Sequence, residues 1–221
     1  MFLLNPFVFS QTQSVFVLDP AKVKLLLHFD GNYNDSSPNN HTMTSGGNVS
    51  ISTSEPKFGT GKLQFGITPR NGFVKSPNIF DFGNKRPFTI SFFYRDGDGN
   101  GFFFTTSDSP TYTPILFGRG GYFFVGNAEL SGWTVLEVDM FIIPIAYKHC
   151  AVVGDGTNIK VYRDGSLIAT TPHPSWASAS YAIEIGGGSP YSSDGGMDEF
   201  LLYDDVLWTA DFTPPTGPFT Y

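Results

Sequence analysis

Short apolar segments recur along this chain at intervals of roughly eight to twelve residues, with clusters of turn-forming residues between them. In the clearest of them, FTISFFYR (88–95), every second residue from Phe88 onward is aromatic or aliphatic, which is the period of a strand. No segment keeps an apolar period of 3.6 residues over three helical turns. The composition agrees, because 16% of the 221 residues are aromatic, while 25 glycines and 16 prolines supply turns. The sequence therefore predicts an all-β protein, a sandwich of two antiparallel sheets.

The boundaries of the strands follow from the same pattern. KVKLLLHF (22–29) is apolar on both faces, with Leu26 opposite Leu25, which predicts a central strand. Two Asp-Gly pairs, one on each side of 158–163, predict tight hairpin turns, because the favoured turn needs positive φ at both central residues. The predicted strands are 22–29, 49–53, 62–65, 72–75, 88–95, 101–106, 114–118, 122–126, 133–139, 146–153, 158–163, 166–171, 182–185 and 197–203.

The charge of the chain argues against two classes of partner. There are 13 basic and 20 acidic residues, which gives a formal net charge of −7. Because phosphate binding needs clustered Lys and Arg, we expect no nucleic-acid partner, and anionic membrane surfaces are disfavoured for the same reason. No window approaches the ~18 apolar residues of a membrane span, so we expect no membrane insertion. The single cysteine, Cys150, excludes an intramolecular disulfide.

Residues 1–21 are predicted to form an N-terminal arm. They carry too many apolar side chains to be left in water, and Pro6 and Pro20 bracket the stretch. Two interpretations are open: an extra strand on the same domain, or an extension that pairs with the sheet of a neighbouring subunit. Because terminal segments stay disordered unless something ties them down, we favour the second, which predicts a homo-oligomer or a partner protein.

Four segments carry a resemblance to a known family. In order, they are LLLHFDGNYNDSSPNNHT (25–42), KFGTGKLQFG (57–66), YKHCAVVGDGTNIKVYRDGSLIATT (147–171) and MDEFLLYDDVLWTADFTPP (197–215). Their order and separations resemble the laminin-G-like, concanavalin A-like jelly roll. The resemblance implies one such domain over 22–221, after the arm.

The motifs FDG, KFG, DEF and TADFTPP resemble, more narrowly, jelly rolls of bacteriophage virion proteins. This implies a non-enzymatic structural protein on the virion surface, as a capsid decoration or part of a tail fibre. It also implies other virion proteins as partners of the arm, and adhesion to a host glycan as a further role. Two alternatives stay open: a secreted carbohydrate-binding module and, less favoured, a jelly-roll enzyme that acts on glycans.

The resemblance further implies a structural calcium ion near the junction of the first and last strands, with Asp30 and Asp198 as ligands and Asp35 as an additional one. From strand alternation we expect Asp198 to share an apolar face with Phe200. A lone carboxylate there would be costly unless it were paired or metal-bound. The alternative is that Asp198 accepts hydrogen bonds from backbone N–H groups of a facing loop.

A second calcium candidate is RDGDGNG (95–101), whose spacing of Asp and Asn fits the start of a calcium-binding loop. The twelfth position of that loop should be glutamate and is Ser107. We therefore favour a tight hairpin for this segment.

Catalysis is not predicted. Glu137 and Asp139 lie two apart on one strand face, similar to the glucanase pattern E-x-D-x-x-E, but the third carboxylate position is Ile142. His149 adjoins Cys150, yet neighbours in a strand point to opposite faces and cannot act together as base and nucleophile. We expect His149 to be structural and Cys150 to lie in the core.

Sugar binding is predicted from aromatic residues in loop-like sequence, because sugars stack their C–H faces on exposed rings. The candidates are Trp176 in HPSWASAS, Tyr191 in GGGSPYSSDGG and Tyr112 in SDSPTYTP. The alternative for each is a place in the core, since most of so many aromatic residues must be buried.

Overall fold

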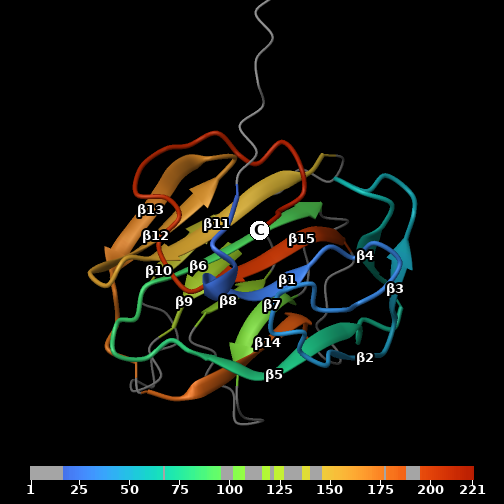
Figure 1. Ribbon diagram of the computed structural model, residues 1–221, viewed down its shortest axis with the longest axis horizontal. Helices are drawn as coiled ribbons and strands as arrows, with labels where there is room; N and C mark the ends of the chain where they lie inside the picture. The colour runs from blue at the N-terminus through green and yellow to red at the C-terminus, as the bar shows by residue number, and fades with distance from the viewer. Residues whose placement is uncertain are drawn as a thin grey trace, which may run out of the picture.

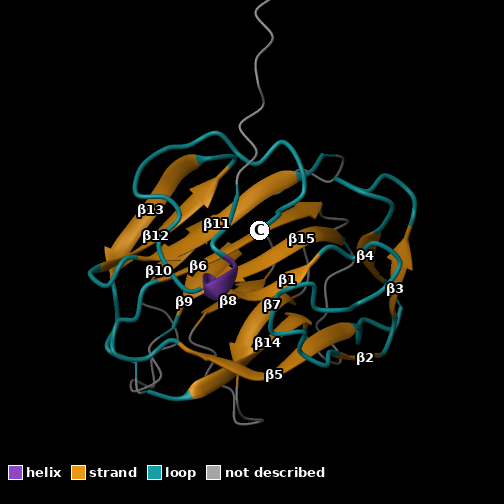
Figure 2. Ribbon diagram, in the orientation of Figure 1, coloured by secondary structure: helices purple, strands orange, loops and turns teal. Residues whose placement is uncertain are grey.

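The computed structural model describes residues 17–66, 68–95, 102–107, 116–119, 122–126, 136–139, 146–176, 178–187 and 195–221. Within these ranges the chain is a two-layer antiparallel β-sandwich with one short 3-10 helix, Pro20–Lys22 (Figures 1 and 2). This confirms the predicted all-β, two-sheet architecture. Among the described residues there is no helix whose length and apolar character would carry it across a bilayer.

The first sheet has eight strands and faces the viewer in Figure 1. Its strands, in spatial order, are β13 (Ser166–Pro172), β12 (Asn158–Arg163), β11 (Lys148–Gly154), β6 (Phe88–Arg95), β15 (Gly196–Tyr203), β4 (Lys62–Phe65) and β3 (Val49–Ser52). The eighth strand, β1 (Val23–Leu27), also pairs with β15.

The second sheet has seven strands and lies behind the first. Its order is β10 (Leu136–Asp139), β9 (Tyr122–Val125), β8 (Leu116–Arg119), β7 (Phe102–Ser107), β14 (Ser180–Gly186), β5 (Phe73–Asp81) and β2 (Thr44–Gly46). Each predicted strand overlaps one of these fifteen. Only β2 was missed among the strands of the described residues, because Thr-Ser-Gly carries no apolar side chain that would mark it.

Both predicted hairpins are present, and one of them has its Asp-Gly pair at the predicted tight turn. Asp164 and Gly165 have φ values of 51° and 81° and connect β12 directly to β13. A Cβ atom at position 165 would lie 1.9 Å from the carbonyl oxygen of Phe212, so glycine is required there. The other Asp-Gly pair lies in a longer connection between β11 and β12, where Asp155 Oδ1 accepts the backbone N–H of Asn158 at 2.7 Å.

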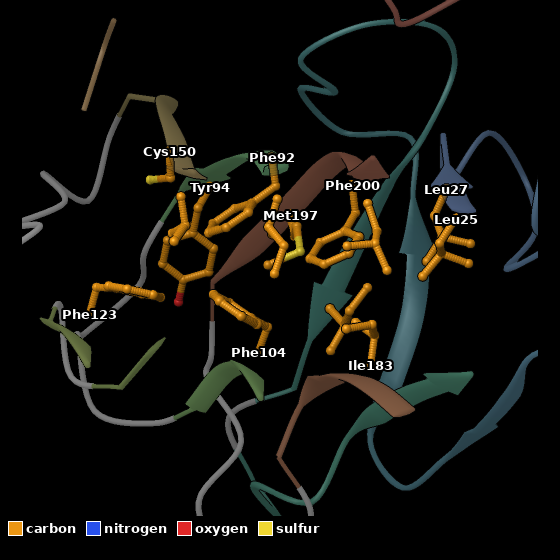
Figure 3. Packing of buried hydrophobic residues seen from close by; sticks show 14 of the residues in the cluster. Leu25, Leu27, Phe92, Tyr94, Phe104, Phe123, Cys150, Ile183, Met197 and Phe200 are labelled. Atoms are coloured by element: carbon orange, nitrogen blue, oxygen red, sulfur yellow. The ribbon is translucent and has the colours of Figure 1, made fainter. Parts of the chain in front are cut away.

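The core between the two sheets is rich in aromatic rings, and Figure 3 shows side chains of both sheets meeting in it. Phe92 of β6 stacks on Phe200 of β15 with ring centroids 5.8 Å apart, and it contacts the edge of Phe104 of β7 at 5.5 Å. The faces predicted for FTISFFYR are confirmed, because Phe88, Ile90, Phe92 and Tyr94 all enter this core. The opposite face of β6 is also buried, at Thr89, Ser91 and Phe93.

That opposite face is buried because later segments of the chain cover the outside of the first sheet. Trp208 and Phe212 stack with centroids 4.0 Å apart over the outer side of β11 and β12. Phe219 covers the outer side of β1 and β15, where it packs with Leu26 and Leu201. In Figure 1 the C-terminus accordingly lies in front of this sheet. The segment after β15 is therefore an integral cover of the sandwich.

The structure corrects the boundary of the predicted N-terminal arm. Leu18 is buried in the same cluster as Phe219, and its backbone N–H donates to the carbonyl of Thr220 at 3.0 Å. Val17 forms a parallel bridge with Thr220. Residues 17–21 therefore belong to the sandwich, because they bury apolar surface on it, while residues 1–16 lie outside the described ranges.

We predict that Leu18→Ala lowers the free energy of unfolding by about 2–3 kcal/mol, because it leaves a cavity between Leu26 and Phe219. Its neighbour Val17 is 69% exposed, so Val17→Ala serves as the matched control and should stay within about 0.5 kcal/mol of the parent. Urea denaturation followed by tryptophan fluorescence measures both. Equal effects of the two substitutions would contradict the corrected boundary.

Candidate functional site

One edge of β15 is shared between two strands, and acidic side chains gather where they meet. Gly196 and Met197 pair with β4, while the stretch from Phe200 onward pairs with β1. Between these two pairings β15 contains a bulge. From Asp198 to Leu201 it advances by three residues, while the paired residues of β6 move by only two, from Phe93 to Ser91. Glu199, inside this bulge, has a φ of 53°. Such an inserted residue re-aims the side chains around it.

The bulge overturns the predicted orientation of Asp198. Met197, Phe200 and Leu202 all enter the core between the sheets, which is possible only because one extra residue is inserted after Met197. Asp198 therefore points to the outer face of the first sheet. Simple alternation had placed it on the same face as Phe200, and this prediction is wrong. The cross-strand neighbour of Asp198 on the outer face is Phe93.

On the outer face Asp198 holds a loop. Its Oδ2 accepts the backbone N–H of Lys57 at 2.7 Å and that of Phe58 at 3.2 Å, and its Oδ1 accepts the N–H of Glu199 at 3.0 Å. Hydrogen bonding to the backbone of a facing loop, the alternative to metal binding, is thus what the structure shows for Asp198. The carboxyl group is completely buried, and burial raises its pKa to about 7 even though these hydrogen bonds favour the charged form.

Asp30 holds the other end of the same loop. Its Oδ1 accepts the backbone N–H of Thr60 at 2.5 Å and that of Gly61 at 2.9 Å. A Cβ atom on Gly59 would lie 2.2 Å from Asp30 Oδ2, so the close approach of the carboxylate requires glycine. The loop Lys57–Gly61 is therefore fixed at both ends by carboxylates of β15 and of the loop after β1. We call this arrangement the amide clamp.

The third predicted calcium ligand, Asp35, fixes a different segment. It accepts the backbone N–H of Leu26 at 3.0 Å, that of Ser37 at 2.8 Å and that of His41 at 2.9 Å. Asp35 therefore organises the loop that follows β1 and does not contribute to the amide clamp.

The contacts of Asp30 and Asp198 do not fit a calcium site. Calcium needs six to eight oxygen ligands, whereas the partners of these two carboxylates are mainly amide hydrogens. Within the described ranges no three His, Cys, Asp or Glu side chains come together as a metal cluster would require. Calcium binding stays a prediction from the resemblance, and the geometry favours the amide clamp.

Two further residues belong to this junction and were not predicted. The Glu199 carboxylate is buried, lies 2.8 Å from His28 Nδ1, and accepts the backbone N–H of Phe219 at 3.0 Å. The hydrogen bond to Glu199 raises the pKa of His28. This pair ties β1 and β15 to the C-terminal segment. The sequence contains no signal for it, because the pairing depends on the bulge.

His149 and Cys150 lie on opposite faces of β11, as predicted. Cys150 is in the core between the sheets. His149 is on the outer face, where its Nε2 lies 2.8 Å from Ser91 Oγ and its ring is covered by Trp208 and Phe212. Burial lowers the pKa of His149 to about 3. This closed environment supports a structural role for the histidine.

The prediction that Trp176 is an exposed platform for a sugar is wrong. Trp176 is only 2% exposed, belongs to the core cluster, and donates from Nε1 to the carbonyl of Gly126 at 2.9 Å. A large ring with one donor is well suited to this place, and its loop-like sequence gave no sign of burial.

The other predicted sugar contacts cannot be placed. Tyr112 and Tyr191 lie outside the described residues, as do positions 96–101 of the second calcium candidate. Glu137 and Asp139 lie in β10, but the structure does not describe their side chains, and Ile142 falls outside the described ranges.

Comparison with known proteins assigns the family. The family model described as the concanavalin A-like lectin/glucanases superfamily matches residues 68–211. The chain therefore belongs to this superfamily, in agreement with the laminin-G-like resemblance of its motifs. No curated protein sequence is detectably similar to the chain.

Solved structures share the fold at low sequence identity. The binding domain of Paraclostridial Mosquitocidal Protein 1 superposes with a TM-score of 0.65 at 13% identity, covering 86% of this chain and 50% of that one. The receptor-binding domain of botulinum neurotoxin D gives 0.64 at 13%, with the same coverage. The serotype D domain in complex with N-acetylneuraminic acid gives 0.61 at 12%, covering 86% and 49%. The chain spans about half the length of these structures.

The buried carboxyl group of Asp198 predicts a specific pH dependence of stability. Its pKa in the folded state, about 7, is above the ordinary 3.8. Between these values the folded state binds a proton that the unfolded state releases, so the free energy of unfolding falls as the pH rises from about 4 to about 7. In Asp198→Asn this contribution should be absent. The difference between parent and variant, from urea denaturation at a series of pH values, isolates it from His28 and Glu199.

A difference in unfolding free energy between parent and variant that stays constant across this pH window would contradict the assignment.

Thermal melting tests calcium binding. If the amide clamp is correct, calcium or a chelator should shift the melting temperature of the parent by less than about 1 °C. A rise of several degrees with calcium, lost in Asp30→Asn and Asp198→Asn, would instead support the calcium site.

Proposed function

We propose that this chain is a non-catalytic carbohydrate-binding domain that is attached to a larger assembly. The observation that carries the proposal is the structural use of the acidic side chains. Asp30, Asp35 and Asp198 each accept backbone amide hydrogens, and Glu199 pairs with His28. Hydrolysis of a glycosidic bond needs two carboxyl groups free to meet the sugar, and these four hold segments of their own chain. A jelly-roll enzyme is therefore the less favoured alternative.

The structural neighbours support a binding role. They are a binding domain, a receptor-binding domain and a ligand-binding domain in complex with N-acetylneuraminic acid. At 12–13% identity the likeness establishes the fold alone, and a fold of this kind hosts many functions. Sugar binding is accordingly part of the proposal. The residues proposed to contact the sugar are Tyr112, Tyr191 and those of the site described in the next subsection.

The larger assembly that we propose is a bacteriophage virion, in which the domain serves as capsid decoration or as part of a tail fibre. The motifs from FDG to TADFTPP support this setting. The apolar sequence of residues 1–16 supports attachment to other virion proteins or to further copies of the chain. Val17, which follows this segment, lies beside Thr220 on the outer face of the first sheet, so the segment joins the domain at that face. A secreted carbohydrate-binding module is the alternative setting.

Glycan binding is tested on an array of bacterial and host glycans. We expect the parent to bind, and Tyr112→Ala or Tyr191→Ala to weaken binding by roughly ten- to a hundredfold if the ring stacks on the sugar. Tyr221, an exposed tyrosine with no predicted sugar contact, supplies the matched control Tyr221→Ala. A blank array with correctly folded protein would overturn the proposal, and turnover of any glycan would restore the enzyme alternative.

Attachment is tested by deleting residues 1–16, which leaves Leu18 and its contacts in place. We expect the shortened chain to fold with an unchanged melting temperature but to be lost from purified phage particles, as measured by quantitative mass spectrometry. Leu18→Ala, which weakens the domain without shortening the segment, is the control for reduced stability. Normal incorporation of the shortened chain would contradict the attachment role.

A further inference from the structure

A buried lysine without a partner lies next to the amide clamp. Lys62 of β4 is only 5% exposed. In the described part of the chain its ammonium group has no hydrogen-bond acceptor and no ion-pair partner. Among the described residues, the side-chain nitrogen and oxygen atoms that have neither solvent contact nor a hydrogen-bond partner are ring nitrogens of His149 and His173. The Lys62 nitrogen is not one of them, so this ammonium group keeps some contact with solvent. A charged group in this position calls for an anion, because burying it alone is costly.

The neighbouring strands place Lys62 at the edge of a small polar area on the outer face of the first sheet. Gln64, Gly196 and Arg95 lie side by side on β4, β15 and β6, in register. Gly196 leaves room at the centre: a Cβ atom there would lie 3.2 Å from Lys62 Cδ and 3.4 Å from Cε. The methylene stem of Lys62 therefore passes over Gly196, and the cations of Lys62 and Arg95 lie on the same face.

A carboxylate of the chain already occupies part of this area. The Glu55 carboxylate contacts Arg95 at 2.5 Å, although its side chain is 66% exposed. The hydroxyl of Tyr147 donates to the backbone carbonyl of Glu55 at 3.2 Å. Because an ion pair with so exposed a partner contributes little, a ligand carboxylate can replace Glu55 at Arg95 at small cost. The guanidinium fork suits a carboxylate geometrically.

A purely structural role for Lys62 would be to neutralise the buried carboxylate of Asp198. The contacts of the two side chains argue against this role. No ion pair joins the two side chains among the described residues. The Asp198 oxygens accept three backbone N–H groups, and burial raises the pKa of this carboxyl group, which reduces its negative charge near neutral pH. Burial, and after it the neighbouring Arg95, lowers the pKa of Lys62, against the opposing influence of the Glu55 and Asp198 carboxylates.

We propose that Lys62 and Arg95, with the Tyr147 hydroxyl beside them, form a binding site for the carboxylate of an acidic sugar. The carboxylate displaces Glu55 from Arg95 and supplies the missing partner of Lys62. On a chain with a net charge of −7, this is a local cationic area that selects an anionic ligand in spite of the overall repulsion. That the ligand is a sugar rests on the function proposed above, whereas the carboxylate contact rests on Lys62 and Arg95.

The test compares glucuronate with glucose, which differ in a carboxylate against a hydroxymethyl group at one carbon. Binding is followed by two-dimensional NMR of the full chain, with acetate as the carboxylate without a sugar. We expect glucuronate to shift resonances around Lys62 and Arg95, and to bind more tightly than glucose or acetate. Lys62→Met keeps the buried stem and removes the charge, and it should weaken glucuronate binding by roughly ten- to a hundredfold. Arg95→Gln should do the same.

The control is Lys75→Met, which removes a lysine that is paired with Glu184 in the second sheet and should leave binding unchanged. We further expect Lys62→Met to melt at the same or a higher temperature than the parent, because it removes an uncompensated charge. A drop of several degrees would show that Lys62 is a structural counter-ion and overturn the site. Glucose binding as tightly as glucuronate would overturn the inference and leave the proposed function standing. Absence of glucuronate binding would overturn the inference, and only together with a blank glycan array would it overturn the proposed function as well.

Discussion

The burial of β15 on both faces is the constraint on which the rest of this structure depends. All eight residues of this strand are buried, so every polar group on it must find a partner in a segment packed against it. Asp198 and Glu199 would be unacceptable in such a strand without partners. The bulge turns Asp198 toward the loop Lys57–Gly61, while Glu199 pairs with His28 and the C-terminal segment. Segments far apart in the sequence are thereby joined at one strand.

The same constraint explains why the chain ends are part of the domain. A sandwich with one open outer face would expose Leu26 and Leu201 on one half of the first sheet and Tyr162 on the other. Leu18 and Phe219 cover the first half, and Trp208 with Phe212 covers the second. Neither of these covers includes Lys62 or Arg95, which lie near Gly196 on the same face.

Membership of the concanavalin A-like lectin/glucanase superfamily is compatible with both binding and catalysis. The contacts of the individual side chains restrict the possible functions further. Carboxylates in the described part of the chain organise loops, and the histidine of β11 is enclosed by aromatic rings. Groups used in this way stabilise the scaffold and are withdrawn from acid–base chemistry. Lys62, by contrast, is a buried cation without a hydrogen-bond or ion-pair partner among the described residues, and a cation on a rigid sheet is suited to recognition.

The sequence alone determined the all-β class, the described strands apart from β2, the inward face of β6, the turn at Asp164–Gly165 and the meeting of Asp30 and Asp198 near one junction, the last through family motifs. These features follow from alternation and turn chemistry, which are local, or from recognisable segments. Tertiary structure decided the rest: the burial of Trp176, the docking of Leu18 against Phe219, the orientation of Asp198 and the isolation of Lys62. The orientation of Asp198 depends on the register and bulge of β15 against strands more than a hundred residues away, and the other three depend on contacts between segments far apart in the sequence. No local pattern encodes which residue is inserted or which side chains are brought together.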